Sequence, residues 1–349
     1  MNILSESTYS NKLIVPRHYI LVDGSYFIFY RFHALTSWWR RAKIDQLEVL
    51  NNPAENAEFV EKFKAICAKK LNELDLNTAL AQDGKQNIKG NKKSIMMSYE
   101  SVLIIAKDCP RENIWRTALY PEYKATRTST PNIYPFFKLF YDEIIPKYQE
   151  RLTSSRPREE IRAPLSPTPV PEGTGSDEKP LNCHIVSHPH FEADDCVAVG
   201  VKQIQKKIDS DAINPVANQS KIFIIASDKD YLQIAEDNKV IIMTANFEII
   251  SERKSSTGSK EADLFCKIVL GDKSDNISGV FENCDKIKCG PKTALKLFGD
   301  KDKEQIEFNK LLAQGGDAVA KKYELNRRLI DFHFIPEAYS QEFIKQYFC

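Results

Sequence analysis

The sequence of 349 residues has no long hydrophobic run and little excess of charge of either sign. No apolar stretch approaches the length needed to cross a bilayer, and residues 1–12 are polar, so we expect neither a membrane span nor a signal peptide. The formal net charge is only +1. The chain as a whole is therefore not a polycation, and any basic surface for nucleic acid must be local.

Metal-binding patterns built from cysteine or histidine are also missing. The eight cysteines are scattered without a Cys-x-x-Cys pair, and Cys284 and Cys289 are too isolated to suggest a zinc site. We expect reduced thiols in an intracellular protein. The six histidines show no ligand spacing, and His184, His188 and His190 are expected to be structural.

Apolar runs of strand length alternate with helical patterns along most of the chain. The expected strands cover 19–22, 102–106, 183–186, 221–226 and 240–243. Helices are expected after residue 23, over 54–76 with Pro53 at its start, over 133–152 with a kink at Pro146, and from about Glu192. This alternation is typical of an α/β fold, a mostly parallel sheet flanked by helices.

Composition suggests how the chain is divided. Residues 153–180 hold a cluster of prolines among Ser, Thr, Gly and Glu, which is typical of a poorly ordered insertion. The strand and helix pattern resumes after it, so the insertion interrupts a domain. We expect an N-terminal extension over 1–16, a core over 17–260, and a helical region over 261–349. The Lys-rich segment 82–94 is expected to be a loop.

Acidic residues gather after the predicted strands and near two helix starts. The carboxylates concerned are Asp23, Asp108, Glu192, Asp194, Asp195, Asp228, Asp230, Asp272 and Asp275. Ligands of parallel sheets bind beyond the carboxyl ends of the strands, so these side chains can meet there. Carboxylates that share a pocket repel each other and resist desolvation unless cations neutralise them.

Carboxylate oxygens without His or Cys suit Mg²⁺ or Mn²⁺, and two such ions can support phosphodiester hydrolysis. Each cluster alone is also a common helix cap or turn. Structural Ca²⁺ binding is a further alternative, although the spacing of an EF-hand is missing from the sequence. The joint occurrence of the clusters at strand ends favours a metal site.

The motifs together resemble the 5′-nuclease or flap-endonuclease superfamily, especially its bacteriophage-type members and the 5′-nuclease domain of bacterial DNA polymerase I. They occur in the order of that family and cover 21–25, 115–116 with 119–127, 192–195, 227–230, 271–276 and 290–294. The resemblance implies a PIN-like core, a helical gateway and a C-terminal helix-three-turn-helix module. It also implies hydrolysis of DNA near 5′ ends and junctions with two or more divalent ions. We predict cleavage of DNA flaps and 5′ ends, and of RNA–DNA primers, in replication or repair.

Carried over by position, the nine carboxylates form the metal site, with Asp83 competing with Asp108 for one place. Arg116, Lys124 and Arg127 are expected to hold the phosphate, where their charge stabilises the transition state. Lys124 and Arg127 are three residues apart, so they share a face if the segment is helical. The alternative for Arg116 is an ordinary solvated helix face.

Further residues match places where the family contacts DNA. Phe29, or alternatively Tyr30, matches an aromatic that stacks on a base near the scissile bond, although this helix is crowded with core aromatics. A helix is expected to begin at Gly290, where backbone N–H groups can receive a duplex phosphate. The contacts expected there involve Lys288, Gly290, Lys292 and Thr293. The family holds K⁺ nearby, but Lys288 replaces an expected glycine and departs from that pattern.

The segment Gln341–Phe348 matches the spacing of a sliding-clamp-binding peptide. The alternative is that its apolar residues pack a terminal helix on the core. We expect a monomer. Two other functions stay open, namely a non-catalytic DNA-junction-binding protein of the same fold and a PIN-type ribonuclease.

Overall fold

The computed structural model describes residue 3 and the ranges 17–80, 100–128, 130–154, 183–210, 219–253, 256–284, 287–299 and 303–349. Three sequence predictions therefore fall wholly or mainly outside the described residues. They are the extension over 1–16 apart from Ile3, the loop over 82–94 with Asp83, and the insertion over 153–180 beyond residue 154. The boundary at residue 260 stays a prediction.

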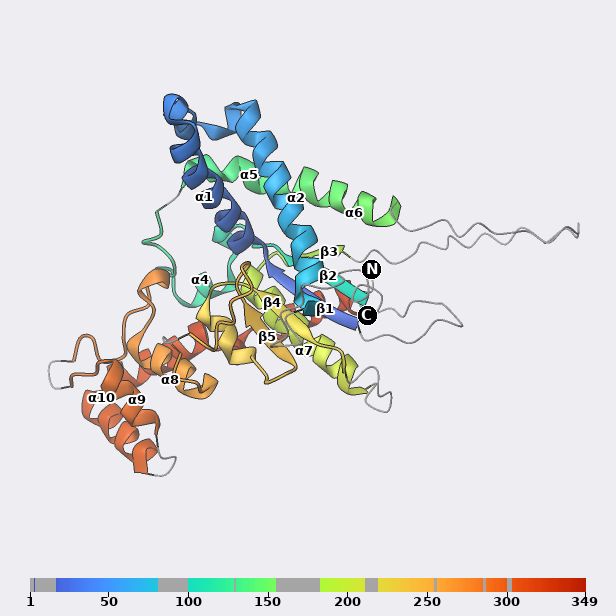
Figure 1. Ribbon diagram of the computed structural model, residues 1–349. Coiled ribbons are helices and arrows are strands. Elements are labelled where there is room, and N and C mark those ends of the chain that lie inside the picture. The colour runs from blue at the N-terminus through green and yellow to red at the C-terminus, as the bar shows by residue number, and fades with distance from the viewer. Residues whose placement is uncertain are drawn as a thin grey trace, which may run out of the picture.

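Five parallel strands form one sheet in the order β3-β2-β1-β4-β5 (Figure 1). The strands are β1 (Arg17–Asp23), β2 (Glu100–Ala106), β3 (Cys183–Val186), β4 (Ile222–Ile225) and β5 (Val240–Met243). All five were predicted, because each is a short apolar run that is buried on both faces. Strands β2 and β3 lie on one side of β1, and strands β4 and β5, which come later in the chain, lie on the other side. The strand order therefore reverses between β1 and β4, which is where ligands bind in sheets of this kind.

Helices cover both faces of the sheet (Figure 1). On one face, side chains such as Ile20 and Val22 pack with α1 (Gly24–Ala42), α2 (Ala57–Leu80), α5 (Tyr134–Leu139) and α6 (Ile145–Ser154). On the other face, Leu21 and its neighbours pack with α7 (Ala193–Ser210) and α11 (Glu337–Tyr347). The mostly parallel sheet flanked by helices is therefore confirmed.

Two predicted helices differ from the structure in detail. Pro53 lies in a separate short helix, η2 (Pro53–Glu55), and α2 begins at Ala57. The helix predicted over 133–152 is three segments, α5, a π-helical turn η6 (Phe140–Ile144) and α6. Pro146 is the second residue of α6, which follows the π-helical turn. Because proline has no N–H to donate, the helix adjusts its hydrogen bonding at this point.

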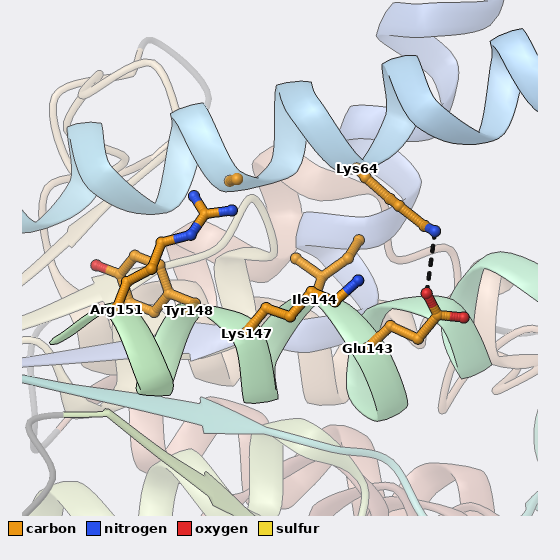
Figure 2. A pocket seen from close by; sticks show the side chains of 7 residues that line it. Lys64, Glu143, Ile144, Lys147, Tyr148 and Arg151 are labelled. Carbon is orange, nitrogen blue, oxygen red and sulfur yellow. Dashed lines mark ion pairs between the residues drawn. The ribbon is translucent and has the colours of Figure 1, made fainter. Parts of the chain in front are cut away.

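The segment after Phe140 packs along α2, and Figure 2 shows the groove between them. Lys64 of α2 forms an ion pair with Glu143 of η6, with Nζ and Oε2 3.0 Å apart. Further along, Lys147, Tyr148 and Arg151 line the groove from α6. None of the nine predicted carboxylates lines this groove.

The C-terminal region is helical, as predicted. Helices α8 (Lys260–Leu270), α9 (Pro291–Phe298) and α10 (Lys303–Ile330) share an apolar cluster around Phe308. The remaining short helices are η1 (Ile44–Asn51), η4 (Arg111–Asn113), α4 (Trp115–Leu119), η5 (Pro131–Ile133), η8 (Lys229–Ile234), η9 (Lys273–Asp275) and η10 (Phe332–Phe334). Among the described helices, none combines the length and the apolar character that a membrane crossing requires.

Candidate metal centre

The acidic residues meet at the carboxyl edge of the sheet, where the strand order reverses. Asp23 is the last residue of β1, and Asp228 follows the adjacent strand β4, whose Ile225 pairs with Val22. Asp108 follows β2, the neighbour of β1 on the other side. The strand ends therefore bring three predicted ligands together from widely separated parts of the chain.

Asp23 is held by hydrogen bonds and surrounded by other acids. Its carboxylate caps α1 by accepting a hydrogen bond of 2.8 Å from the backbone N–H of Tyr26, and it accepts another of 2.9 Å from the Tyr231 hydroxyl. Burial, together with the charges of Asp108 and Asp228, raises the pKa of Asp23 from 3.8 to about 7. This carboxylate therefore resists ionisation unless a cation lies nearby.

Asp108 is fixed from two sides. The Ser25 hydroxyl donates to one of its oxygens, and the backbone N–H of Ala193 at the start of α7 donates to the other at 2.8 Å. The hydrogen bond to Ala193 joins the end of β2 to the acidic start of α7. Asp108 thus connects the Asp23 side of the edge with the carboxylates of Glu192, Asp194 and Asp195.

Three acids occur at the start of α7, where the helix dipole favours negative charge. Ligand oxygens of Glu192, Asp194 and Asp195 lie within 4.8 Å of one another, close enough to share one cation. Burial and the neighbouring Asp195 raise the pKa of Asp194 well above its usual range. Burial alone would also raise the pKa of Glu192, but the charges of Lys124 and Arg116 outweigh burial and lower it.

Arg116 is buried in this cluster, which corrects the expectation that it faces a phosphate or the solvent. Its side chain is 2% exposed and donates to both oxygens of Asp195 at 2.8 and 2.9 Å. It also donates to Glu192 at 3.1 Å and to the carbonyl of Leu329 at 2.8 Å. Arg116 is therefore a positioning residue that holds two acids in place, because its donors are engaged by the protein.

Lys124 and Arg127 lie in a segment of turns, so the condition for a shared helical face is not met. Lys124 has φ 58°, and its backbone N–H donates to the carbonyl of Asp275 at 2.8 Å. Its ammonium contacts Glu192 and lies 3.7 Å from Asp275. Arg127, half-exposed, donates to the same Asp275 carboxylate at 2.5 Å. Both side chains thus reach the acidic site, and it is the turn of the backbone, not the spacing of a helix, that brings them there.

The remaining two acids share a cation that the motifs did not single out. Asp230 and Asp272 both contact Lys267, whose ammonium lies 2.8 Å from Asp272. Burial raises the pKa of Asp230 to about 6 although Lys267 opposes it. For Asp272, Lys267 and Ser274 outweigh burial and lower the pKa to about 2. The signal for Lys267 was weak, since an isolated lysine near a helix end is common.

The nine carboxylates fall into two sets, according to whether they form an ion pair with a lysine or arginine of the protein. Five are paired with Arg116, Lys124, Arg127 or Lys267. Among the described residues, four form no ion pair with a protein cation, and these are Asp23, Asp108, Asp194 and Asp228. The Tyr231 hydroxyl donates to Asp23 at 2.9 Å, and burial together with the charges of Asp23, Asp194 and Asp108 raises its pKa. This oxygen-rich, partly buried set fits a hard divalent cation.

The predicted DNA contacts lie on the surface. Phe29 is 37% exposed on α1 and meets the ring of Phe137 edge-on, whereas the Tyr30 hydroxyl is engaged by Asn246. Gly290 precedes α9, and the exposed residues around this helix start include Lys288, Lys292 and Thr293. The K⁺ site expected nearby stays a prediction, and residues 285 and 286, which precede Lys288, lie outside the described residues.

The C-terminal peptide packs on the core, which is the second of the two expectations for Gln341–Phe348. Phe343 and Phe348 are buried in the cluster that covers one face of the sheet, with Ile344 and Tyr347 against them. The Tyr347 hydroxyl donates to the carbonyl of Ser187 at 3.2 Å. In this arrangement Phe343 and Phe348 are buried, and Ile344 and Tyr347 are partly buried.

Residues 258–349 match the family described as T4 RNase H, C terminal. The chain is 29% identical over 165 residues to a protein named Ribonuclease H from Enterobacteria phage T4, a match that covers 45% of this chain and 48% of the relative. The matched part thus spans about half the length of that relative.

Solved structures of phage T5 proteins align over most of the chain. A T5 5′-exonuclease variant aligns with a TM-score of 0.49 and 15% identity, covering 95% of this chain and 97% of the other. A T5 flap endonuclease variant with DNA and metal ions aligns with a TM-score of 0.49 and 16% identity over the same shares. The sequence matches therefore make these parts of the chain similar to phage T4 ribonuclease H.

Proposed function

We propose that the chain is a structure-specific 5′ nuclease, a metal-dependent hydrolase that cleaves DNA phosphodiesters at 5′ ends and flaps. The observation that carries the proposal is the convergence of nine carboxylates on one sheet edge beside Lys124 and Arg127. Acidic residues alone would repel a phosphate, and basic residues alone could bind it without a metal ion. The combination suits hydrolysis of a phosphodiester by divalent ions.

The charges of the site support a centre for two ions. Nine carboxylates face four protein cations, which leaves an excess of about five negative charges if all acids are ionised. Two divalent ions would offset most of this excess. The four acids without a protein cation, Asp23, Asp108, Asp194 and Asp228, are the ligands we propose. Mg²⁺ is the proposed ion, with Mn²⁺ as a substitute.

The chain's own residues would bind and orient the substrate. Bound divalent ions supply activation of water and neutralise charge on the phosphodiester. Lys124 is pinned by Glu192 and Asp275 at the edge of the acidic set, where its ammonium can meet a phosphate oxygen. Arg127, half-exposed, can reach the same group. Phe29 offers an exposed ring on which a base near the cleaved bond can stack.

The start of α9 is proposed to bind the duplex next to the cleaved strand. Its exposed backbone N–H groups after Gly290, with Lys288, Lys292 and Thr293, suit a phosphate and carry no sequence preference. The protein would then act intracellularly, as a monomer, on junctions of duplex and single strand that arise in replication or repair.

The name of the phage T4 relative favours RNA as a second substrate. A nuclease of this kind would remove the RNA of RNA–DNA primers. A DNA flap, an RNA flap and an RNA–DNA hybrid of the same sequence should be compared side by side. Cleavage confined to RNA flaps would favour a PIN-type ribonuclease instead.

The decisive experiment uses a 5′-labelled DNA flap, Mg²⁺ and the full chain. We expect cleavage that EDTA abolishes and that Asp228→Ala reduces strongly, whereas Asp237→Ala, at an exposed position nine residues further on, leaves it unchanged. Undiminished cleavage in EDTA or in Asp228→Ala would contradict the metal mechanism. Junction binding without cleavage in Mg²⁺ or Mn²⁺ would support the non-catalytic alternative.

A further inference from the structure

Lys267 stands between two acids of the candidate metal centre. It lies in the last turn of α8, and its side chain is mostly buried. Its ammonium contacts a carboxylate oxygen of Asp230, which follows β4, and lies 2.8 Å from Oδ2 of Asp272, which follows α8. One protein cation therefore neutralises two acids that come from different elements.

The local backbone fixes this arrangement. The carbonyl of Lys267 accepts the N–H of Gly271 at 2.8 Å, which ends the helix. Gly271 has φ 76°, and a Cβ there would lie 2.3 Å from the carbonyl oxygen of Ile277. Only glycine fits this turn. Asp272 and Ile277 then exchange backbone hydrogen bonds of 2.8 Å, so the turn directs Asp272 back toward Lys267.

A fixed ammonium changes what these two acids can bind. A carboxylate oxygen that accepts a charge-assisted hydrogen bond has fewer lone pairs for a metal ion. The ammonium also repels a second cation nearby, more strongly in a partly buried site than in water. By contrast, Asp23, Asp108 and Asp194 form no ion pair with a protein cation among the described residues.

We propose that Lys267 is a positioning residue that occupies the place between Asp230 and Asp272 and thereby confines divalent ions to Asp23, Asp108, Asp194 and Asp228. Asp230 and Asp272 then hold Lys267 rather than a metal ion. The lysine limits the number of ions, so the centre takes fewer ions than nine carboxylates would otherwise accept. This inference rests on the proposed function only in requiring that the centre binds divalent ions.

The test counts Mn²⁺ ions bound to the full chain without nucleic acid, from the electron paramagnetic resonance signal of free Mn²⁺. Lys267→Met keeps the length of the side chain and removes its charge. Lys260→Met is the matched control, since Lys260 is an exposed residue two turns earlier on the same helix. We expect Lys267→Met to bind one further Mn²⁺ per chain, and Lys260→Met to bind as many as the wild type.

Equal Mn²⁺ counts in Lys267→Met and wild type would overturn the inference and leave the proposed function intact. Failure of the wild type to bind any Mn²⁺ would overturn both. If Lys267→Met does not fold, as judged by circular dichroism, Asp272→Asn in the wild-type background gives the answer. We expect that variant to keep the wild-type count, and loss of an ion would contradict the inference.

Discussion

Arg116 and Asp195 form two parallel hydrogen bonds of 2.8 and 2.9 Å inside the protein, with 2% and 0% of their side chains exposed. Arg116 comes from α4 and Asp195 from the first turn of α7, so the pair joins two elements beneath the acidic edge. The Trp115 side chain donates to the same Asp195 carboxylate at 3.0 Å. Asp195 is thus held by protein donors, whereas Asp194 forms no ion pair with a protein cation among the described residues.

We expect Arg116→Met to destabilise the protein by about 3–5 kcal/mol, because it leaves Asp195 buried without its cation. Arg328→Met is the control, since Arg328 is exposed on α10. The free energy of unfolding from urea titrations measures both. Adding Asp195→Asn to Arg116→Met should recover part of the loss, and a purely additive further loss would show that the two residues are not coupled.

The pKa of Asp23 predicts how the metal-free protein responds to pH. Its folded pKa is raised from 3.8 to about 7, so the stabilisation it provides is complete below about pH 4 and is lost as pH rises through 7. We expect unfolding titrations in EDTA to show this loss, on the order of a few kcal/mol. Asp23→Asn should flatten the dependence. An unchanged pH profile in that variant would rule out Asp23 as its source.

Divalent ions should oppose this loss of stability at high pH. An ion bound by Asp23 favours its ionised form, so binding releases a proton below about pH 7. We therefore expect Mg²⁺ to raise the melting temperature more at pH 8 than at pH 5. Equal shifts at both pH values would contradict the assignment of Asp23 as a ligand.

The ends of the strands could be predicted from the sequence, and the contacts between the charged residues could not. Apolar runs such as 102–106 predict buried parallel strands, and parallel strands bring the residues that follow them, such as Asp23 and Asp228, to one edge. Spacing alone could not show that Lys124 has φ 58° in a turn, since this conformation depends on a hydrogen bond to Asp275, far away in sequence. Spacing also could not show that Arg116 is buried rather than solvated, or that Lys267 contacts two of the acids.

Phe29 offers a test of base stacking with a matched control. Trp38 lies on the same helix with nearly the same exposure, 38% against 37%, but about half a turn around the axis, since nine residues separate the two. Stacking on an aromatic ring contributes about 1–3 kcal/mol. We expect Phe29→Ala to weaken binding of a flap substrate by roughly tenfold or more, with Trp38→Ala close to wild type, as measured by fluorescence anisotropy in Ca²⁺. Equal effects of both substitutions would argue against a specific stacking site.

Substitutions in the C-terminal helix α11 distinguish packing on the core from binding to a sliding clamp. Phe343 is fully buried against the sheet, whereas Gln341 is exposed. If the segment serves the core, Phe343→Ala should cost about 3–5 kcal/mol of stability, and Gln341→Ala should change neither stability nor activity. If it binds a clamp, Gln341→Ala should abolish the stimulation of cleavage by the clamp while the protein stays folded. The structure favours the first outcome, because the aromatic residues that a clamp pocket would need already fill the space between α11 and α7. Urea titrations of the two variants, with flap cleavage measured with and without clamp, distinguish these outcomes.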